Sequence, residues 1–258
     1  MTLSLEGYLI LLPVIFLAGF VDSIAGGGGL LSVPAYLATG LPPHYVLGNN
    51  KFSSVFGTLL TTVRYSRSKM IDIKIALPGA FFALIGSGMG TRTVLLINPS
   101  FLNYILIILI PAITVFTLVN KNVGKLKKDH CLKSAKLYIV ASLIGLVIGF
   151  YDGFFGPGTG SFLMFFYMVL LGSDYVAANA NAKVVNLASN VAAAVTFLIS
   201  GKVIIAIGIP AAICGIAGNW LGSRLVIRNG IKIIRPFFLM VLTILFVRIV
   251  YNLFINGN

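Results

Sequence analysis

The chain has 258 residues, of which 58% are apolar and only 10% are charged, and its net charge is +13. This balance is typical of an integral membrane protein and excludes a disordered chain, a disulfide scaffold and a cytosolic enzyme. We expect no nucleic-acid partner despite the positive charge, because the basic residues gather in a few short loops.

Hydropathy predicts ten helical segments, five in each half of the chain. In the first half they are residues 5–25, 30–39, 46–65, 75–97 and 101–119. In the second half they are residues 137–155, 161–171, 175–200, 203–227 and 235–254. The second segment of each half has about half the apolar length that a bilayer crossing needs, so we interpret it as re-entrant. The total is then six full crossings plus re-entrant pieces, or eight to ten crossings if the short segments also span.

The second half of the chain repeats the first. Gly19, Phe20, Asp22, Gly26 and Gly28 recur 130 residues later as Gly149, Phe150, Asp152, Gly156 and Gly158. At an offset of 132, Gly40, Asn49, Lys51, Pro78, Gly86 and Arg92 recur as Gly172, Asn181, Lys183, Pro210, Gly218 and Arg224. We therefore expect a first repeat at residues 1–119, a linker at 120–136 and a second repeat at 137–258. An odd number of crossings in each half would invert the second repeat.

Basic residues indicate how the chain is oriented in the bilayer. Fourteen of the 19 Lys and Arg residues fall in three loops, at residues 64–74, 121–136 and 224–235. Under the positive-inside rule these loops face the cytoplasm, which makes the linker cytoplasmic and places both termini outside. The expected fold is an all-α membrane protein, a polytopic helical bundle of two inverted repeats with glycine-broken, short or re-entrant helices.

Two glycine clusters interrupt the apolar pattern at equivalent positions. One consists of Gly26, Gly27, Gly28 and Gly29, and the other contains Gly156, Gly158 and Thr159. Irregular backbone is tolerated in a membrane only against protein or a water-filled cavity. We interpret the clusters as broken helices whose free N–H groups face an anion. Glycines that allow close helix packing are the alternative.

Amide and lysine side chains begin two long segments. The first group is Asn49, Asn50 and Lys51, and the second is Asn179, Asn181, Lys183 and Asn186. The lysines would lie on the order of 8–12 Å inside their helices. A charge at such depth is a functional candidate by default, and ammonium beside amide groups suits an anionic, oxygen-rich ligand. Snorkelling of the lysines to the headgroups is the alternative.

Two acidic residues precede the glycine clusters. Asp22 and Asp152 each lie four residues before a cluster. They are candidate proton carriers or ionic partners of Lys51 and Lys183, and helix caps are an equal alternative.

The motifs around these residues resemble those of the TauE/SafE family of sulfite-exporter-like permeases (the TSUP family), most closely its YfcA-like branch. The resemblance rests on the segments 19–29, 33–34, 47–51 and 149–160 and covers nearly the whole chain. It implies a bacterial inner-membrane transporter of small sulfur-containing anions such as sulfite or organosulfonates. Thr159 stands where the first repeat has Gly29, so the two half-sites need not be equivalent.

The predicted function is a secondary permease or exporter that moves a small anion by alternating access. We expect a sulfur-containing oxyanion as substrate, a proton as candidate coupling ion, the lipid bilayer as surroundings, and no cofactor or metal. ATP-driven transport and enzymatic activity are not expected, because the chain has no P-loop, nucleophile elbow or metal-binding histidine motif. The alternatives are an anion channel, a membrane-embedded enzyme and an accessory subunit. The patterns predict no particular oligomeric state.

Overall fold

The computed structural model describes residues 3–98, 134–234 and 236–237. Regular structure in these ranges is helical: α1 (Leu5–Ala25), α2 (Gly29–Ala38), α3 (Pro43–Arg67), α4 (Ile73–Leu95), α6 (Ser134–Phe154), α7 (Thr159–Leu171), α8 (Tyr175–Ile199) and α9 (Ile205–Asn229). The predicted segment 101–119 lies outside the described residues. So do most of the predicted segment 235–254 and of the linker 120–136.

The helix ends lie close to the predicted ones because capping residues mark them. Ser4 precedes α1, and its side chain accepts a hydrogen bond from Gly7 N. Asp174 precedes α8, and its carboxylate accepts from Val176 N and Ala177 N. Asp72 has the same role at the start of α4. Side-chain acceptors of this kind satisfy backbone donors that have no partner within the first helical turn.

Five described helices are long and apolar enough to cross a bilayer: α1, α4, α6, α8 and α9. Their exposed surfaces carry large apolar side chains such as Leu9, Phe81, Val147 and Ile213, as expected of a protein surrounded by lipid. Helix α3 has 25 residues and is about 37 Å long, but it is rich in polar residues. It packs between α8 and α9, which shield it. The chain is therefore a multi-pass, all-α membrane protein.

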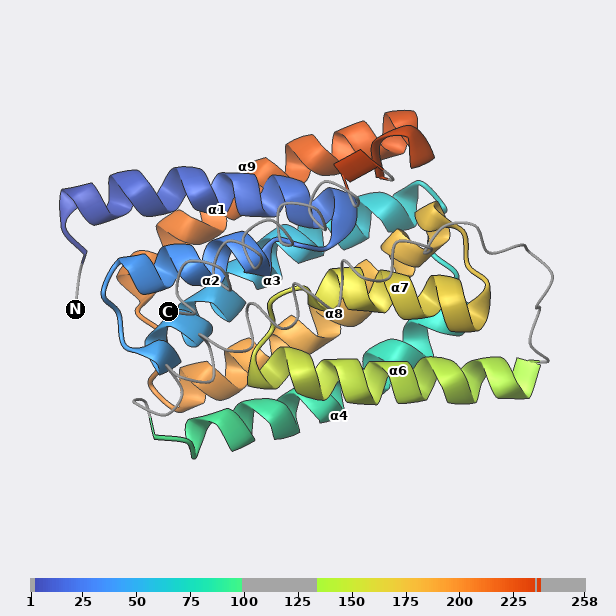
Figure 1. Ribbon diagram of the computed structural model, residues 1–258, viewed down its shortest axis with the longest axis horizontal. Coiled ribbons are helices and arrows are strands. Elements are labelled where there is room, and N and C mark those ends of the chain that lie inside the picture. Colours follow the sequence, from blue (N-terminus) through green and yellow to red (C-terminus); the bar gives the residue numbers. More distant parts are fainter. Residues whose placement is uncertain (1–2, 99–133, 235, 238–258) are drawn as a thin grey trace, which may run out of the picture.

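The helices lie side by side along one axis, and those at equivalent positions in the two halves run in opposite directions. In Figure 1, α1 and α3 run from left to right, whereas α6 and α8 run from right to left. The C-terminal ends of α3 and α9 and the N-terminal ends of α4 and α6 lie at the same end of the bundle. The basic loop at residues 64–74, which joins α3 to α4, therefore lies at the same end as Arg224 and Arg228 near the end of α9.

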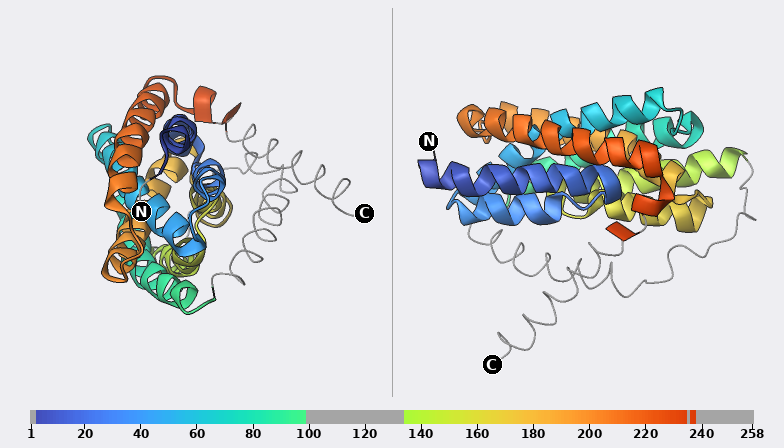
Figure 2. Two further views of the ribbon diagram at one scale, coloured as in Figure 1. Left: turned by 90° about the vertical axis from the view of Figure 1, so that its left-hand side faces the viewer. Right: turned by 90° about the horizontal axis from the view of Figure 1, so that it is seen from above.

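The two halves exchange helices. Helix α4 packs on α6 and α8 of the second half, and α9 packs on α1 and α3 of the first half. Helices α3 and α8 also contact each other directly. The end-on view in Figure 2 shows one bundle rather than two separate ones. Each pairing in one half thus has a counterpart in the other.

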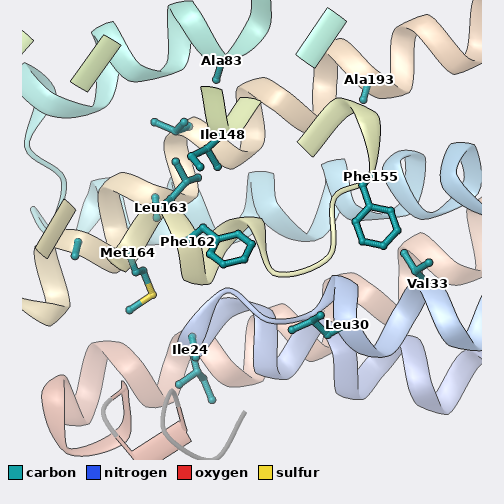
Figure 3. Close-up of a cluster of buried hydrophobic side chains, with 14 of the residues drawn as sticks. Ile24, Leu30, Val33, Ala83, Ile148, Phe155, Phe162, Leu163, Met164 and Ala193 are labelled. Carbon is teal, nitrogen blue, oxygen red and sulfur yellow. The ribbon is translucent and has the colours of Figure 1, made fainter. Parts of the chain in front are cut away.

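Apolar side chains fill the space between the two short helices. Leu30 and Val33 of α2, together with Ile24 of α1, are buried in the same cluster as Phe155 and Phe162 of the second half. In Figure 3, Ile24, Leu30 and Val33 lie below Phe155 and Phe162. The residues around the two helix breaks therefore share one apolar core, in which α1 contacts α7.

Glycines allow the exchanged helices to come close. On α4, a Cβ atom at Gly86 would collide with the carbonyl oxygen of Leu146 on α6. At the equivalent position on α9, a Cβ atom at Gly218 would collide with the carbonyl oxygen of Phe16 on α1. These glycines, which recur in the sequence, serve helix packing.

The effect of a Gly→Ala substitution in α4 on protein stability is expected to depend on the helix face that carries it. Gly86→Ala should destabilise the protein by about 1–3 kcal/mol, because the helices must separate. Gly88, on the same helix, has no heavy atom within 4 Å of its Cβ position. Gly88→Ala should therefore stabilise α4 by up to about 1 kcal/mol through helix propensity. Thermal unfolding of both variants in detergent would measure the difference, and equal midpoints would contradict the packing argument.

Candidate functional site

The two glycine clusters meet inside the bundle. Helix α1 ends at Gly26, which has a φ of 75° and bonds its N–H to the carbonyl of Asp22. A Cβ atom at Gly26 would lie 2.6 Å from the Cα atom of Gly160. Ser161 donates a hydrogen bond from its N–H to the carbonyl of Gly26 (3.3 Å) and from its hydroxyl to the carbonyl of Ala25 (2.8 Å). The loops that interrupt the two halves are thus in direct backbone contact.

A cavity of about 50 Å³ adjoins this contact and is lined by residues of both halves. Ten predicted site residues line it: Asp22, Gly26, Gly28, Gly29, Asn50, Lys51, Asp152, Gly156, Thr159 and Asn186. One water needs about 10–15 Å³ measured in this way, so the cavity has room for a few waters or a small ion. Most of the predicted site residues therefore lie around one cavity.

One buried ion pair lies in the cavity wall. Lys51 Nζ of α3 is 2.6 Å from Asp152 Oδ1 of α6, and both side chains are at most 3% exposed. Lys51 also donates to Asn190 Oδ1 at 3.1 Å. Asp152 accepts further hydrogen bonds from the hydroxyl of Thr159 (2.6 Å) and from that of Ser189. The Thr159 hydroxyl also lies 2.7 Å from the carbonyl of Gly156, so its single proton is shared between the two acceptors.

The equivalent pair joins the other two charges. Lys183 Nζ of α8 is 2.8 Å from Asp22 Oδ2 of α1. The Lys183 side chain is 1% exposed, whereas that of Asp22 is 16% exposed and lines the cavity. Each aspartate thus pairs with the lysine of the opposite half. Both lysine ammonium groups are held inside the protein rather than extended towards lipid headgroups, and removing either partner would leave an expensive buried charge.

Two predicted asparagines hold helix ends instead of lining the cavity. Asn49 Oδ1 accepts a hydrogen bond from Ile204 N, which precedes α9, at 3.2 Å. Asn181 Oδ1 accepts from Asp72 N, which precedes α4, at 2.8 Å. The two bonds are equivalent under the 132-residue offset. Each asparagine thus fixes the start of a helix in the opposite half.

The remaining predicted residues also lie outside the cavity lining. The side chain of Asn179 donates to the carbonyls of Ser23 (3.2 Å) and Ile24 (3.0 Å), which are at the end of α1. Gly158 precedes α7 in a left-handed conformation with a φ of 82°. Gly27 lies in the loop between α1 and α2. Lys183 reaches the cavity only through Asp22.

Some cavity residues were not predicted. They are mostly small or polar: Ser32, Ser53, Ser54, Thr58, Gly215 and Asn219, with Ile15, Ala18 and Gly19. Two further lining residues, Asn190 and Gly160, extend the predicted polar face of α8 and the predicted second glycine cluster. The repeat carried a signal for part of this set, because Ser54 and Thr58 of α3 are equivalent to Asn186 and Asn190 of α8. The repeat gave no such signal for Asn219, because its equivalent in the first half is Ser87, which is not an amide. The Ser87 hydroxyl donates a hydrogen bond to the carbonyl of Ser189.

Among the described residues, no group of three or more His, Cys, Asp or Glu side chains is placed to hold a metal ion. Helices of bilayer length around a cavity with two buried ion pairs define a polytopic membrane protein with an internal polar site. The chain belongs to the Sulfite exporter TauE/SafE family, whose model matches residues 11–249.

Several curated proteins are similar to the chain over most of its length. The probable membrane transporter protein ORF9 of Sinorhizobium sp is 37% identical over 91% of this chain and 88% of its own length. The probable membrane transporter protein YfcA of Escherichia coli K12 is 34% identical over 94% and 89%. A probable membrane transporter protein of Haemophilus influenzae is 34% identical over 98% of both chains. No solved structure matches the chain. The family is thus one of probable membrane transporters, not of enzymes.

Proposed function

We propose that the chain is a secondary transporter that moves a small oxyanion through the cavity between its two halves. The observation that carries this proposal is the cavity itself. Amide and hydroxyl groups line it beside two ion pairs, Lys51 with Asp152 and Lys183 with Asp22. Ionisable groups are expensive inside a membrane protein and mark substrate or ion pathways. The N-terminal ends of α2 and α7 border the cavity at Gly29 and Thr159, so the positive ends of two helix dipoles lie where an anion would bind.

Alternating access between two inverted repeats is the proposed mechanism. The opposite directions of equivalent helices and the mirrored helix contacts support it, because such repeats can exchange their conformations. The cavity lies where the halves meet, so a rocking movement of one half against the other would open it to each side in turn.

The proposed substrate is a sulfur-containing oxyanion such as sulfite or an organosulfonate. The name of the family supports sulfur chemistry. The amide and hydroxyl donors of Asn50, Asn186 and Ser54 suit anionic oxygen atoms.

The proposed location is the bacterial inner membrane, with both termini outside and residues 121–136 in the cytoplasm. The shared position of the basic loop 64–74 and of Arg224 and Arg228 supports this orientation.

Flux measured in liposomes tests the function. We expect the purified protein to give saturable uptake of at least one compound among the anions sulfite, thiosulfate, methanesulfonate, sulfoacetate and sulfate and the zwitterion taurine. Asn186→Leu should lower this uptake at least tenfold, because it replaces a cavity amide with an apolar side chain. Gly88→Ala, on an open face of α4, is the matched control and should keep wild-type uptake.

Three outcomes would contradict the proposal. Flux that does not saturate would indicate an anion channel. Chemical conversion of an added substrate would indicate an enzyme, and the absence of flux for every anion would favour an accessory subunit.

A further inference from the structure

The two aspartates of the ion pairs have different surroundings although the repeat makes them equivalent. Asp152 accepts hydrogen bonds from the hydroxyls of Thr159 and Ser189 in addition to its ion pair. Under the offsets of 130 and 132, the residues equivalent to these two donors are Gly29 and Gly57. Both hydroxyls are therefore missing on the side of Asp22. Its Oδ2 atom binds Lys183, and its side chain keeps access to the cavity.

We propose that Asp22 is the group that exchanges a proton with the cavity and couples proton movement to anion movement, whereas Asp152 remains a fixed negative charge. The inference rests on the proposed transport function. The ammonium of Lys51 and the hydroxyls of Ser189 and Thr159 surround the Asp152 carboxylate. Asp22 has fewer donors and a path by which a proton can arrive from the cavity.

The charge balance explains why a proton is needed. The two ion pairs contribute two positive and two negative charges, so the described charged groups around the cavity sum to zero. A monovalent anion that enters would add an uncompensated charge in a poorly hydrated place. A proton on the Asp22 carboxylate neutralises it, so that the positive charge of Lys183 behind it balances the charge of the anion. One proton and one monovalent anion together keep the site neutral.

The other titratable groups near Asp22 are consistent with this role. Lys51 and Tyr65 of α3 interact electrostatically with Asp22, in addition to Lys183 of α8. Asp152 of α6 lines the same cavity. The lining residues from α2, α7 and α9 are glycine, serine, threonine and asparagine. Among the described residues that line the cavity, Asp22 is thus the carboxylate without hydroxyl donors.

Methanesulfonate is a suitable probe for proton coupling because it carries one negative charge throughout the working pH range. Any proton that accompanies it therefore belongs to the protein. In proteoliposomes, we expect the wild-type protein to move about one proton per methanesulfonate, measured with an internal pH indicator. Asp22→Asn should lose this proton movement. Proton movement that persists in Asp22→Asn would overturn the proposal.

A pair of variants at Gly29 tests the missing hydroxyl directly. Gly29→Ser adds a donor at the position equivalent to Thr159, and Gly29→Ala adds the same Cβ atom without it. That Cβ atom would lie 3.1 Å from Pro157 Cα, so a small adjustment accommodates either residue. We expect the proton concentration that gives half-maximal uptake to be about tenfold higher for Gly29→Ser than for Gly29→Ala. The reason is that the new hydrogen bond favours the ionised form of Asp22. Identical pH profiles would contradict the proposal.

An infrared pH titration of the purified protein separates this inference from the transport proposal, since it needs no substrate. Other carboxyl groups, such as those of Glu6, Asp72 and Asp174, also protonate on acidification, so the readout is the difference from the wild type. A protonated-carboxyl band that is smaller in Asp22→Asn, but of wild-type size in Asp152→Asn, would support proton exchange at Asp22. A band that is smaller in Asp152→Asn instead would overturn it. Absent flux together with a band assigned to Asp22 would remove the transport proposal alone.

Discussion

Replacing Asp152 with asparagine should destabilise the protein by about 3–5 kcal/mol, because the Lys51 ammonium would remain buried without its counter-ion. The cost of a broken buried pair comes mainly from the charge that is left behind. Simultaneous removal of both charges, in a Lys51→Met and Asp152→Leu double variant, should therefore recover most of the stability.

Thermal unfolding of the two proteins in detergent would test this reasoning, with the amount of folded protein in the membrane as a second readout. Lys51→Met alone completes the double-mutant cycle and gives the coupling energy of the two side chains. A double variant as unstable as Asp152→Asn would show that the hydroxyl contacts of Asp152, rather than its charge, hold the site together.

The second large effect is expected at the contact between the glycine loops. Gly26→Ala should cost about 2–5 kcal/mol, for two separable reasons. A side chain in the left-handed conformation at a φ of 75° costs about 1–2 kcal/mol. A Cβ atom 2.6 Å from Gly160 Cα would also push the two loops apart, which costs about 1–3 kcal/mol more.

Gly40 provides the matched control for this variant. Its φ is 76°, but no heavy atom lies within 4 Å of its Cβ position. Gly40→Ala should therefore show the conformational cost alone. The difference in unfolding midpoint between the two variants measures how tightly the loops pack. Equal losses would mean that the loops can separate freely.

Much of the fold was predictable because local sequence determines it. Apolar length defines the helices, and residues such as Ser4, Asp72 and Asp174 mark where they begin. The repeat further predicted that Asp22 and Asp152, like Lys51 and Lys183, have equivalent positions.

The choice of partners was not predictable from the sequence. The sequence also allows an ion pair within one half, between Lys51 and Asp22. Only the packing of the two halves against each other places Lys51 beside Asp152 instead. Asn49 and Asn181 share the polar pattern of the cavity residues, yet they bond backbone N–H groups at helix starts. One helical turn decides which face a side chain occupies, and the packing of neighbouring helices sets that face.

The exchange of helices also has a consequence for biosynthesis. Lys51 leaves the ribosome about a hundred residues before Asp152, and α4 is made before α6 and α8, against which it packs. The first half is thus made before the residues that pair with its charges and before the helices that cover its glycine-lined surfaces. Its final arrangement forms only when the second half has been inserted, so assembly is completed late and depends on translation of the whole chain.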